Sequence, residues 1–375
     1  MHLLNPNFAV FKISTKYGFN SYKILIEEVE EKLANEIISQ IKNIGINFEI
    51  SKSSNDYINI EIYLKSEEEY SKFQNLKSFA ILDDASKCLI NYLSTPSYIK
   101  IGSRLFDFSK KSYIMGILNV TPDSFYDGGR YFNFDSALNR SFKIIEENAD
   151  IIDVGGQSTR PGSIRISEEE EIRRVIPVIK EIRKKSDIPI SIDTYYSRVA
   201  EEAISAGADL INDISGLIAD LRMPEICLKY NVPIVLMHIR GNPSIMQKNI
   251  HYNNVVIDIL RSLRRKIIYA KEKGLSEKQL LIDPGLGFGK HFEENIEIIR
   301  HLDVFKCLGL PILVGHSRKS FVGKIIGNLP VEERLEASLA MLAYMIIKGA
   351  NIIRVHDVKE SVRVREVIDK LLYFN

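Results

Sequence analysis

The sequence predicts an α/β fold in which a small α+β domain at residues 1–108 precedes a (β/α)8 TIM barrel at residues 109–375. The first observation is an alternation: from Tyr113 onward, short β-branched apolar runs alternate with longer amphipathic stretches. The second is a change of character near residue 110, before which glycines are few and Glu, Lys, Ser and Asn are frequent. Eight units of similar length favour a closed barrel over a doubly wound open sheet, which is the alternative.

Composition sets the class of protein. The 375 residues and 42.8 kDa exceed one small domain, and 45% apolar with 26% charged residues is typical of a globular chain. The 50 Lys and Arg residues balance 49 Asp and Glu, so a net charge of +1 argues against nucleic-acid binding or membrane anchoring through bulk charge. The three cysteines lie far apart and offer neither a disulfide framework nor a CxxC metal spacing.

We therefore expect a cytoplasmic protein. The N-terminal string MHLLNPNFAVFKIS lacks a basic region followed by an apolar one, so no signal peptide is expected. The longest apolar stretch, residues 337–347, is too short to span a bilayer.

The N-terminal region has the pattern of a small α+β domain. Residues 8–13, 46–50 and 57–64 resemble strands, and a second helix is expected at residues 84–93. A first helix, closed by Gly45, is predicted by apolar residues at three- and four-residue steps: Ile26, Val29, Leu33, Ile37, Ile41 and Ile44. No chemical motif is visible here, and a packing or dimer-supporting role is favoured over a regulatory one.

The barrel region contains eight candidate strands, each followed by a helical stretch. The strands are expected at residues 113–120, 151–156, 189–194, 210–215, 233–238, 280–285, 311–317 and 352–357. The clearest helices are expected at residues 136–148, 168–185, 197–206 and 334–348. Turns such as AGAD at 206–209 and KGAN at 348–351 mark the return from a helix to the next strand.

Polar residues stand at the C-terminal end of every candidate strand. They are Asn119, Asp153, Asp193, Asn212 with Asp213, His238, Asp283, His316 with Ser317, and Arg354 with His356 and Asp357. In a parallel barrel these ends meet at one rim, where active sites are built. One such residue would be unremarkable, but eight of eight strands predict a functional rim.

The residues at this rim suggest two kinds of chemistry. Arg160, Arg354, His356, Ser317 and Ser320 stand beside glycine-rich turns and are suited to an anion such as phosphate. Three other residues, Asp193, Asn212 and Asp283, are acceptors that need partners if they are buried. The long segments 121–132 and 157–167 are candidate mobile loops. We infer a ligand with a flat, nitrogen-rich ring and a phosphate tail.

Eight strings now place the chain beside a known family. They are MGILNVTPDSF, DVGGQSTRPGS, SIDT, INDISG, MHIRGNP, DPGLGFGK, GHSRKSFVG and RVHDV, in this order between residues 115 and 358. Together they resemble the dihydropteroate synthase family, and the resemblance covers residues 113–375. It implies condensation of a hydroxymethyl-dihydropterin diphosphate with p-aminobenzoate to give dihydropteroate and pyrophosphate in folate synthesis, with Mg²⁺ and as a homodimer.

The resemblance also implies roles for individual residues. Asn119 matches the Mg²⁺ ligand, and the pterin-binding set is matched by Asp193, Asn212 and Asp283. The residues matched to catalysis are Lys319 against the pterin, Arg354 and His356 at the diphosphate, and Asp193. Thr159, Arg160 and Pro161 match a mobile loop that helps close the p-aminobenzoate site with Phe288, Lys319 and Ser320, and Asp127 matches the other mobile loop.

Some positions depart from the family pattern. Gln157 stands where Glu commonly precedes STRP, and Tyr196 stands where Lys commonly follows SIDT-Tyr. His316 precedes the Ser-Arg-Lys string, and His291 follows GFGK. None of these changes removes a residue matched to chemistry.

Simpler interpretations apply to other residues. Asp153 is expected to support the rim, His238 to be a satisfied inner-barrel histidine, and the Glu run at 168–171 to be a solvated first turn of a helix. GLGFGK lacks the spacing of a nucleotide-binding loop. The competing functions are a pterin-dependent methyltransferase, a synthase for a modified arylamine, and a barrel without activity that serves as a scaffold.

Overall fold

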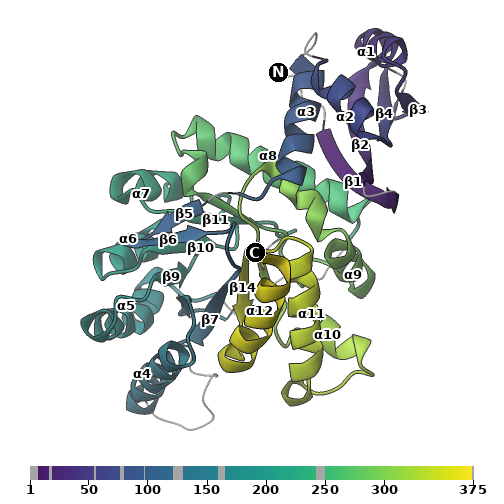
Figure 1. Cartoon of the computed structure of the whole chain (residues 1–375). Helices are drawn as coiled ribbons and strands as arrows, with labels where there is room; N and C mark the ends of the chain where they lie inside the picture. Colours follow the sequence, from purple (N-terminus) through teal and green to yellow (C-terminus); the bar gives the residue numbers. More distant parts are fainter. Residues whose placement is uncertain are drawn as a thin grey trace. The chain divides into compact units, whose positions relative to one another are not determined.

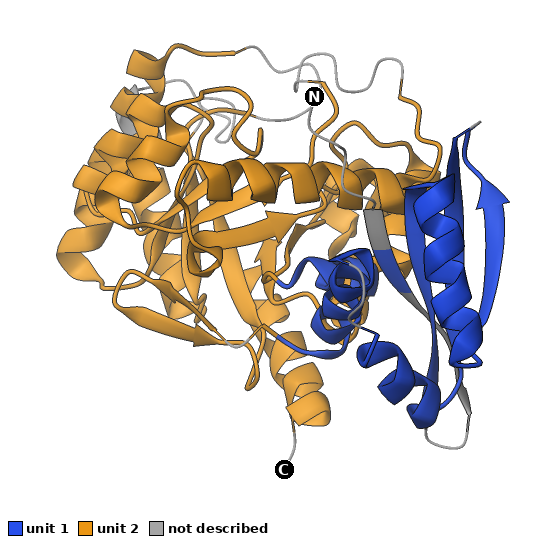
Figure 2. Cartoon of the chain, turned by 90° about the horizontal axis from the view of Figure 1, so that it is seen from above, with its two compact units in different colours: residues 1–95, 303–309 blue, residues 96–302, 310–375 orange. Residues whose placement is uncertain are grey.

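The computed structural model describes residues 7–16, 19–54, 56–76, 80–96, 98–120, 130–158, 165–241 and 250–373, with residues 7, 8, 11–16, 19 and 130–133 described for the backbone alone. The chain forms two compact units (Figure 2). Unit 1 comprises Met1–Thr95 and Asp303–Gly309, and unit 2 comprises Pro96–Leu302 and Leu310–Asn375. A division into domains at residues 108/109 stays a prediction, whereas these compact units divide after Thr95.

Unit 1 is built on a four-stranded antiparallel sheet with the order β1-β2-β4-β3 (Figure 1). Its strands are β1 (Asn7–Lys16), β2 (Phe19–Glu30), β3 (Asn47–Lys52) and β4 (Tyr57–Leu64). In β4 every second residue from Ile58 to Leu64 is buried, so one face of the sheet packs into the core. The α+β character expected for the N-terminal region is confirmed.

The first helix begins later than the apolar spacing predicted. Ile26 and Val29, expected on its face, belong to β2 instead, where they pair with Ile60 and Ile58 of β4. Helix α1 spans Glu31–Asn43, and Gly45 follows its end with a φ of +73°. Ile24 and Ile26 are both fully buried two residues apart, and this alternation is the strand signal that the three- and four-residue spacing concealed.

Two further helices and a distant segment complete unit 1. Helix α2 spans Glu67–Gln74, and α3 spans Ala80–Leu93, beginning before the expected Asp84. The segment Asp303–Gly309, largely within the 3-10 helix η3 (Leu302–Leu308), also belongs to this unit. There Tyr92 donates from its hydroxyl to Asp303 Oδ2 at 2.7 Å, and Asn91 donates to the Cys307 carbonyl at 3.2 Å.

Unit 2 is the predicted barrel. Eight parallel strands follow the order β12-β11-β10-β9-β8-β7-β14-β13, and a parallel bridge between Ile282 and Ile312 closes the ring. The strands are β7 (Tyr113–Asn119), β8 (Ile151–Gly155), β9 (Ile190–Asp193), β10 (Leu210–Asp213), β11 (Ile234–Met237), β12 (Leu280–Asp283), β13 (Leu313–Gly315) and β14 (Ile352–Val355). Closure excludes the doubly wound alternative.

Helices surround these strands (Figure 1). They are α4 (Arg130–Glu146), α5 (Glu168–Lys185), α6 (Ser197–Ser205), α7 (Met223–Tyr230), α8 (Val255–Glu272), α9 (Phe292–Arg300), α10 (Ser320–Ile325), α11 (Leu335–Ile347) and α12 (Val358–Tyr373), with short 3-10 helices η2 (Glu277–Gln279) and η4 (Val331–Glu333). Within the described ranges, no helix combines the length and apolar character that a membrane span requires.

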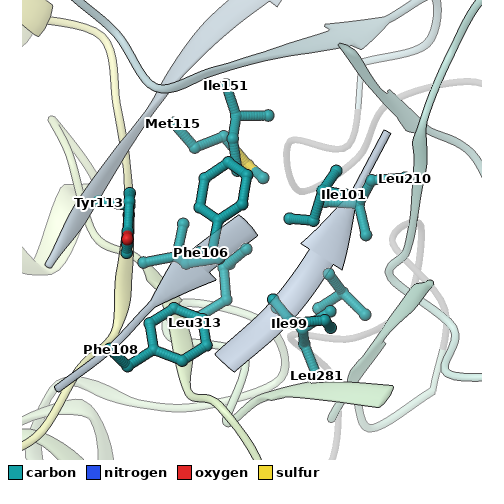
Figure 3. Close-up of a cluster of buried hydrophobic side chains, with 12 residues drawn as sticks. Ile99, Ile101, Phe106, Phe108, Tyr113, Met115, Ile151, Leu210, Leu281 and Leu313 are labelled. Atoms are coloured by element: carbon teal, nitrogen blue, oxygen red, sulfur yellow. The ribbon is translucent and has the colours of Figure 1, made fainter. Parts of the chain in front are cut away.

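A short antiparallel hairpin fills the amino end of the barrel. It consists of β5 (Tyr98–Ile101) and β6 (Arg104–Asp107), which sequence analysis left without an element. Its apolar side chains and Phe108 join a buried cluster with residues near the start of the barrel strands (Figure 3): Ile99, Ile101, Phe106, Phe108, Tyr113, Met115, Ile151, Leu210, Val235, Leu281, Leu313 and Ile352. Since this end is packed with apolar groups, the polar carboxyl end is left for the site.

Candidate active site

The polar residues expected at the rim come from the parallel strands, most of them from the carboxyl ends and Asp153 from the middle of β8. Asn119, Asp193 and Asp283 are the last residues of β7, β9 and β12. Asn212 lies near the end of β10, and Arg354 lies near the end of β14. The strand register places these residues at the same height along the barrel axis. Asn212 pairs with Asp193, and Arg354 pairs with Gly315 of β13.

Arg354 joins two carboxylates across this rim. Its Nε donates to Asp153 Oδ2 at 2.6 Å, and its Nη2 donates to Asp193 Oδ2 at 2.8 Å. The same oxygen of Asp153 also accepts from Asn212 Nδ2 at 3.3 Å. Asp153 is fully buried, and its Oδ1 has no hydrogen-bond partner among the described residues. Four strands, β8, β9, β10 and β14, are therefore linked by one polar network.

This network shifts the acid–base behaviour of its members. Burial raises the pKa of Asp193 to about 7, an effect that Arg354 opposes and the charge of Asp153 reinforces. The two carboxylates raise the pKa of Arg354 against the effect of its burial, so the guanidinium stays charged. Asp193 is thus poised to exchange a proton near neutral pH.

Asp283 is held by the turn that follows its strand. Its Oδ1 accepts from the Gly285 backbone N–H at 2.7 Å. Burial raises the pKa of this carboxyl, whereas that hydrogen bond and the charges of Lys319 and Lys290 lower it. A buried carboxyl group with fixed orientation suits a planar ligand edge that offers two donors.

Lys319 lies against the same turn. Its Nζ donates to the Leu286 carbonyl at 2.5 Å and lies 4.5 Å from the centroid of the Phe288 ring. Burial lowers the pKa of the amine to about 8, although the charge of Asp283 favours the ammonium. Gly287 makes this approach possible, because a Cβ there would lie 3.0 Å from Lys319 Cδ.

His356 pairs with Ser317 rather than with an acid. Its backbone N–H donates to Ser317 Oγ at 3.2 Å, and its Nδ1 lies 3.2 Å from the same oxygen. Burial lowers the pKa of His356 to about 4, and the charge of Arg354 adds to this. The imidazole is therefore neutral at pH 7 and can approach an anion only as a neutral hydrogen-bond donor. A bidentate ion pair between Arg318 and Asp357 links the same two loops.

Several expected site residues lie outside the described residues. These are Thr159, Arg160 and Pro161 of the segment after β8, and Asp127 of the segment after β7. Ser320, the first residue of α10, is described and exposed. The roles of the whole matched set stay predictions.

The two departures at Gln157 and Tyr196 fall in one cluster beside the segment after β8. Gln157 and the Tyr195 hydroxyl exchange hydrogen bonds at 2.8 and 3.2 Å. The Arg165 guanidinium stacks at 4.7 Å from the Tyr196 ring centroid and also bonds to the Tyr196 hydroxyl, which itself donates to the Ile166 carbonyl. Neutral and stacking contacts thus satisfy both substituted side chains.

Asn119 is the one residue matched to a metal. Among the described residues, no group of three or more His, Cys, Asp and Glu side chains could hold a metal ion. Mg²⁺, however, is bound through few protein oxygens together with waters and substrate phosphates. A Cβ at Gly155 would lie 3.8 Å from Asn119 Oδ1 and 3.7 Å from Asp193 Oδ2, so the glycine keeps a space between these two oxygens. This donor set fits a hydrated Mg²⁺ ion.

One sequence interpretation is wrong for a residue near the site. Glu171, expected in a solvated helix turn, is 1% exposed and lies behind β8. Its Cγ would be 2.9 Å from a Cβ at Gly156, and its Oε1 has no hydrogen-bond partner among the described residues. Burial raises the pKa of Glu171 to about 8. The charged run concealed that its fourth member turns inward, one helical turn after Glu168.

The supporting role expected for Asp153 agrees with its contacts, whereas Lys290 was not singled out from the sequence. Asp153 orients both Arg354 and Asn212, and its position in the strand-end pattern was the available signal. Lys290 ends the GLGFGK string and is buried, which is rare for a lysine.

The fold and the rim define a barrel enzyme that binds a polar ring and an anion at the carboxyl ends of its strands. The chain belongs to the pterin binding enzyme family, whose model matches residues 115–356. It is 50% identical over 272 residues to the dihydropteroate synthase of Clostridium beijerinckii, covering 72% of this chain and 98% of that protein.

Solved structures support the same assignment. A dihydropteroate synthase of Xanthomonas albilineans with 4-aminobenzoic acid superposes with a TM-score of 0.70 at 36% identity, over 75% of this chain and 100% of that one. The X. albilineans enzyme in complex with 7,8-dihydropteroate gives a TM-score of 0.67 at 34% identity, over 74% and 100%. Both similarities are to proteins about as long as unit 2, and neither relative accounts for unit 1.

Proposed function

We propose that this chain is a dihydropteroate synthase that condenses 6-hydroxymethyl-7,8-dihydropterin diphosphate with p-aminobenzoate. The single observation that carries this function is the rim, where Asp283, Asp193 and Asn212 meet the cations of Lys319 and Arg354. Related enzymes named for this activity, one of them solved with 7,8-dihydropteroate, support it.

The chemistry is a substitution at the CH2 carbon next to the pterin ring. The arylamine nitrogen forms a C–N bond to this carbon while the C–O bond to the diphosphate breaks. The electron pair of that bond leaves with pyrophosphate, and the nitrogen then releases one proton. Because an arylamine is neutral at pH 7, catalysis can rest on positioning and on stabilising the leaving group rather than on a strong base.

We assign the pterin ring to the acceptor side of the rim. Asp283 would receive the two donors of the amino-pyrimidine edge, since its carboxylate is buried and its Oδ1 is already fixed by Gly285. Asn212 and Asp193 would bind the rest of the ring from neighbouring strands. The near-neutral pKa of Asp193 lets this residue match a ring whose protonation changes as the diphosphate departs.

We assign the diphosphate to the end of the rim formed by β13 and β14. Arg354 keeps its charge, and its engagement by Asp153 and Asp193 fixes the plane of the guanidinium. His356 and Ser317 would add neutral donors. A single fixed cation with neutral donors binds an anion without holding the product pyrophosphate too tightly.

We assign the arylamine to the neighbourhood of Lys319, Phe288 and Ser320, with Thr159, Arg160 and Pro161 completing it. The stacking of Lys319 on Phe288 supports this assignment, because it presents an aromatic face and an ammonium together. An aromatic carboxylate would be recognised by both features. The choice between p-aminobenzoate and a modified arylamine is made by the assay below.

We further propose that Asn119 would hold Mg²⁺ beside the diphosphate. When bound, Mg²⁺ would neutralise charge on the leaving group. The space kept by Gly155 between Asn119 and Asp193 supports this site. A homodimer is also proposed. Exposed apolar residues on the packed helices α11 and α12, among them Ile347, Val367 and Leu371, support an interface there.

The test is pyrophosphate release by the purified full chain with Mg²⁺, p-aminobenzoate and the pterin diphosphate, omitting each in turn. Release that depends on both organic substrates is the expected result. Binding of the pterin diphosphate without release would indicate a different arylamine. Absence of both binding and release would contradict the proposal and favour a methyltransferase or a scaffold, whereas the neighbouring cations of Lys319 and Arg354 favour a site for an anionic substrate.

A further inference from the structure

Lys290 is a buried lysine at the end of the turn that follows β12. Its side chain is 3% exposed, and its Nζ lies inside the turn that it ends. The amine lies 2.8 Å from the Gly285 carbonyl, 2.9 Å from the Phe288 carbonyl and 3.0 Å from His238 Nδ1. The amine also lies 3.4 Å from the His238 carbonyl, so these acceptors take up all of its N–H donors.

The turn it occupies has little stiffness of its own. Gly285, Gly287 and Gly289 all have positive φ angles, a conformation that glycine adopts readily. These three residues have no side chains that could pack against their neighbours. Side chains from outside supply the missing support. Asn295 of α9 accepts from the Gly287 N–H at 2.6 Å, and Tyr252 donates to the Gly289 carbonyl at 2.9 Å. Lys290 adds the bonds at Gly285 and Phe288.

The same turn presents the groups that contact Lys319. The Leu286 carbonyl accepts from Lys319 Nζ, and the Phe288 ring lies under that amine. The two carbonyls bound by Lys290 flank this contact surface, one immediately before Leu286 and the other on Phe288 itself. A shift of the turn would therefore move both contacts of Lys319 together.

We propose that Lys290 is a positioning residue for the condensation, and that it acts by fixing the turn at residues 285–289 on which Lys319 and the arylamine rest. This inference rests on the proposed function of the rim. His238 serves as a neutral acceptor in this arrangement, because burial and the nearby lysines lower the pKa of its imidazole well below the ordinary value. His238 is therefore a satisfied inner-barrel residue, as expected.

The chain provides a matched control in Lys266. This lysine of α8 is also buried, at 6% exposure, and also donates to two backbone carbonyls, those of Ser215 and Met237 at 2.6 and 2.7 Å. Its described bonds reach the loop after β10 and Met237, the last residue of β11, rather than the turn beneath Lys319. Replacing either lysine should lower the stability of the fold, whereas only replacement of Lys290 should misplace Lys319.

The experiment compares Lys290→Met and Lys266→Met in the full chain. For Lys290→Met we expect the KM for p-aminobenzoate to rise and kcat to fall, together by up to about 100-fold. Affinity for the pterin diphosphate should change less than the arylamine KM, since Asp193 and Asn212 keep their contacts and only the Gly285 N–H that holds Asp283 belongs to the turn. Lys266→Met should lower the thermal midpoint similarly but leave the arylamine KM within about threefold. Equal kinetic losses in both variants would overturn the proposal.

A second readout does not depend on turnover. The rate at which an amine-acylating reagent labels Lys319, followed by mass spectrometry of its peptide, reports the surroundings of that amine. Lys290→Met should change this rate and Lys266→Met should not; an unchanged rate in Lys290→Met would contradict the inference. Wild-type protein without activity would instead count against the proposed function, and the labelling comparison would still decide the role of Lys290.

Two more variants guard against ambiguity. If Lys290→Met fails to fold, Asn295→Asp replaces it, because the aspartate keeps the acceptor for Gly287 but loses the donation to the Lys290 and His291 carbonyls. If Lys290→Met folds, Phe288→Ala is combined with it. If Lys290 acts through Phe288, the double variant should lose little more arylamine affinity than Phe288→Ala alone. Fully additive losses would show that Lys290 acts by another route.

Discussion

Asp153 and Arg354 form an ion pair that spans two strand gaps of the barrel rim, with 2.6 Å between Asp153 Oδ2 and Arg354 Nε. Their strands, β8 and β14, lie on either side of β7. The carboxylate is fully buried and also accepts from Asn212, so one side chain orients a cation and an amide that are both matched to substrate. The geometry of the rim therefore depends on a residue that need not contact substrate.

Asp153→Asn tests this dependence. The amide removes one of the two carboxylates that hold Arg354. Breaking a buried ion pair costs about 3–5 kcal/mol, and the pair that remains with Asp193 places the expected loss at the lower end of this range. Misplacement of Arg354 and Asn212 should also lower kcat/KM for the pterin diphosphate by about 10- to 100-fold. Chemical denaturation and steady-state kinetics measure the two effects.

The control for Asp153→Asn is Asp209→Asn. Asp209 pairs with Arg183 at 2.6 Å, just before β10 and so at the amino end of the barrel. Its loss should destabilise the fold while kcat/KM stays within about threefold. A comparable kinetic loss in both variants would mean that Asp153 acts only through stability.

Asp283→Asn tests the proposed contact with the pterin edge. An amide can accept only at its oxygen and turns a donor toward a ligand edge that itself donates. Since hydrogen bonds to charged groups contribute about 1.5–3 kcal/mol, we expect the Kd for the pterin diphosphate to rise by about 10- to 100-fold. Calorimetry measures this change. Asp213→Asn, a change at another carboxylate with 1% exposure, should have a smaller effect; equal losses would contradict a specific contact.

Lys319→Ala and Lys319→Arg separate the charge of this residue from its position. Removing the amine should lower kcat by about 100-fold or more, as loss of a transition-state donor does. The pKa of Lys319 is lowered to about 8, with Asp283, Asp193 and Arg354 as its charged neighbours. The ammonium is lost as pH rises through 8, so wild-type kcat/KM should fall between pH 7 and 9.

The arginine variant provides the check on this assignment. Because arginine does not deprotonate in this range, the fall on the alkaline side should disappear in Lys319→Arg, even if the overall rate is lower. A rate profile from pH 6 to 9.5 measures both. Persistence of the same alkaline fall in Lys319→Arg would assign it to another group.

Sequence patterns predicted which polar residues come together at the rim, because barrel topology decides where the strand ends lie. Once eight strands are parallel, the last residues of each must meet, and Asp193, Asn212, Asp283 and Arg354 do. The patterns failed where contacts with residues distant in the sequence determine the secondary structure. Ile26 and Val29 fit a helix face, but pairing with β4 holds them in a strand.

Burial of polar residues was the harder part to predict. Glu171 and Lys290 sit in strings that look solvated or glycine-rich, and only the packing of a helix against β8, or of a turn against Lys319, determines that they are buried. The hairpin at residues 98–107 was missed for a related reason. The hairpin contains few apolar residues, so its sequence pattern is weak. These residues are buried only because they fill the end of the barrel.

Glu171→Gln tests the burial of this carboxyl through the pH dependence of stability. The folded-state pKa is raised to about 8 by burial, above the ordinary 4.5. Between these values the folded chain holds a proton that the unfolded chain has released, so the free energy of unfolding should fall as pH rises, by at most about 1.4 kcal/mol per pH unit from this group.

Glutamine is a neutral mimic of the protonated acid and should remove that contribution. Denaturant unfolding at pH 5, 6, 7 and 8 should give curves for wild type and Glu171→Gln that diverge as pH rises, with the variant more stable at pH 8. Asp193, whose pKa is also raised, contributes with the same sign in both proteins and does not cancel the difference. Parallel curves would contradict a buried, protonated Glu171.

Deletion of residues 1–95 and deletion of residues 1–108 should give different proteins. A chain beginning at Pro96 keeps the hairpin whose residues Ile99, Ile101 and Phe106, with Phe108, fill the amino end of the barrel. A chain beginning at Ser109 loses all four side chains. Removing even one buried Ile or Phe costs about 2–5 kcal/mol, and four exceed the stability of a typical domain. We therefore expect the shorter deletion to retain cooperative unfolding and pterin binding, and the longer one to aggregate. Circular dichroism and thermal unfolding distinguish the two outcomes. A cooperatively folded chain beginning at Ser109 would show that the barrel does not need this hairpin.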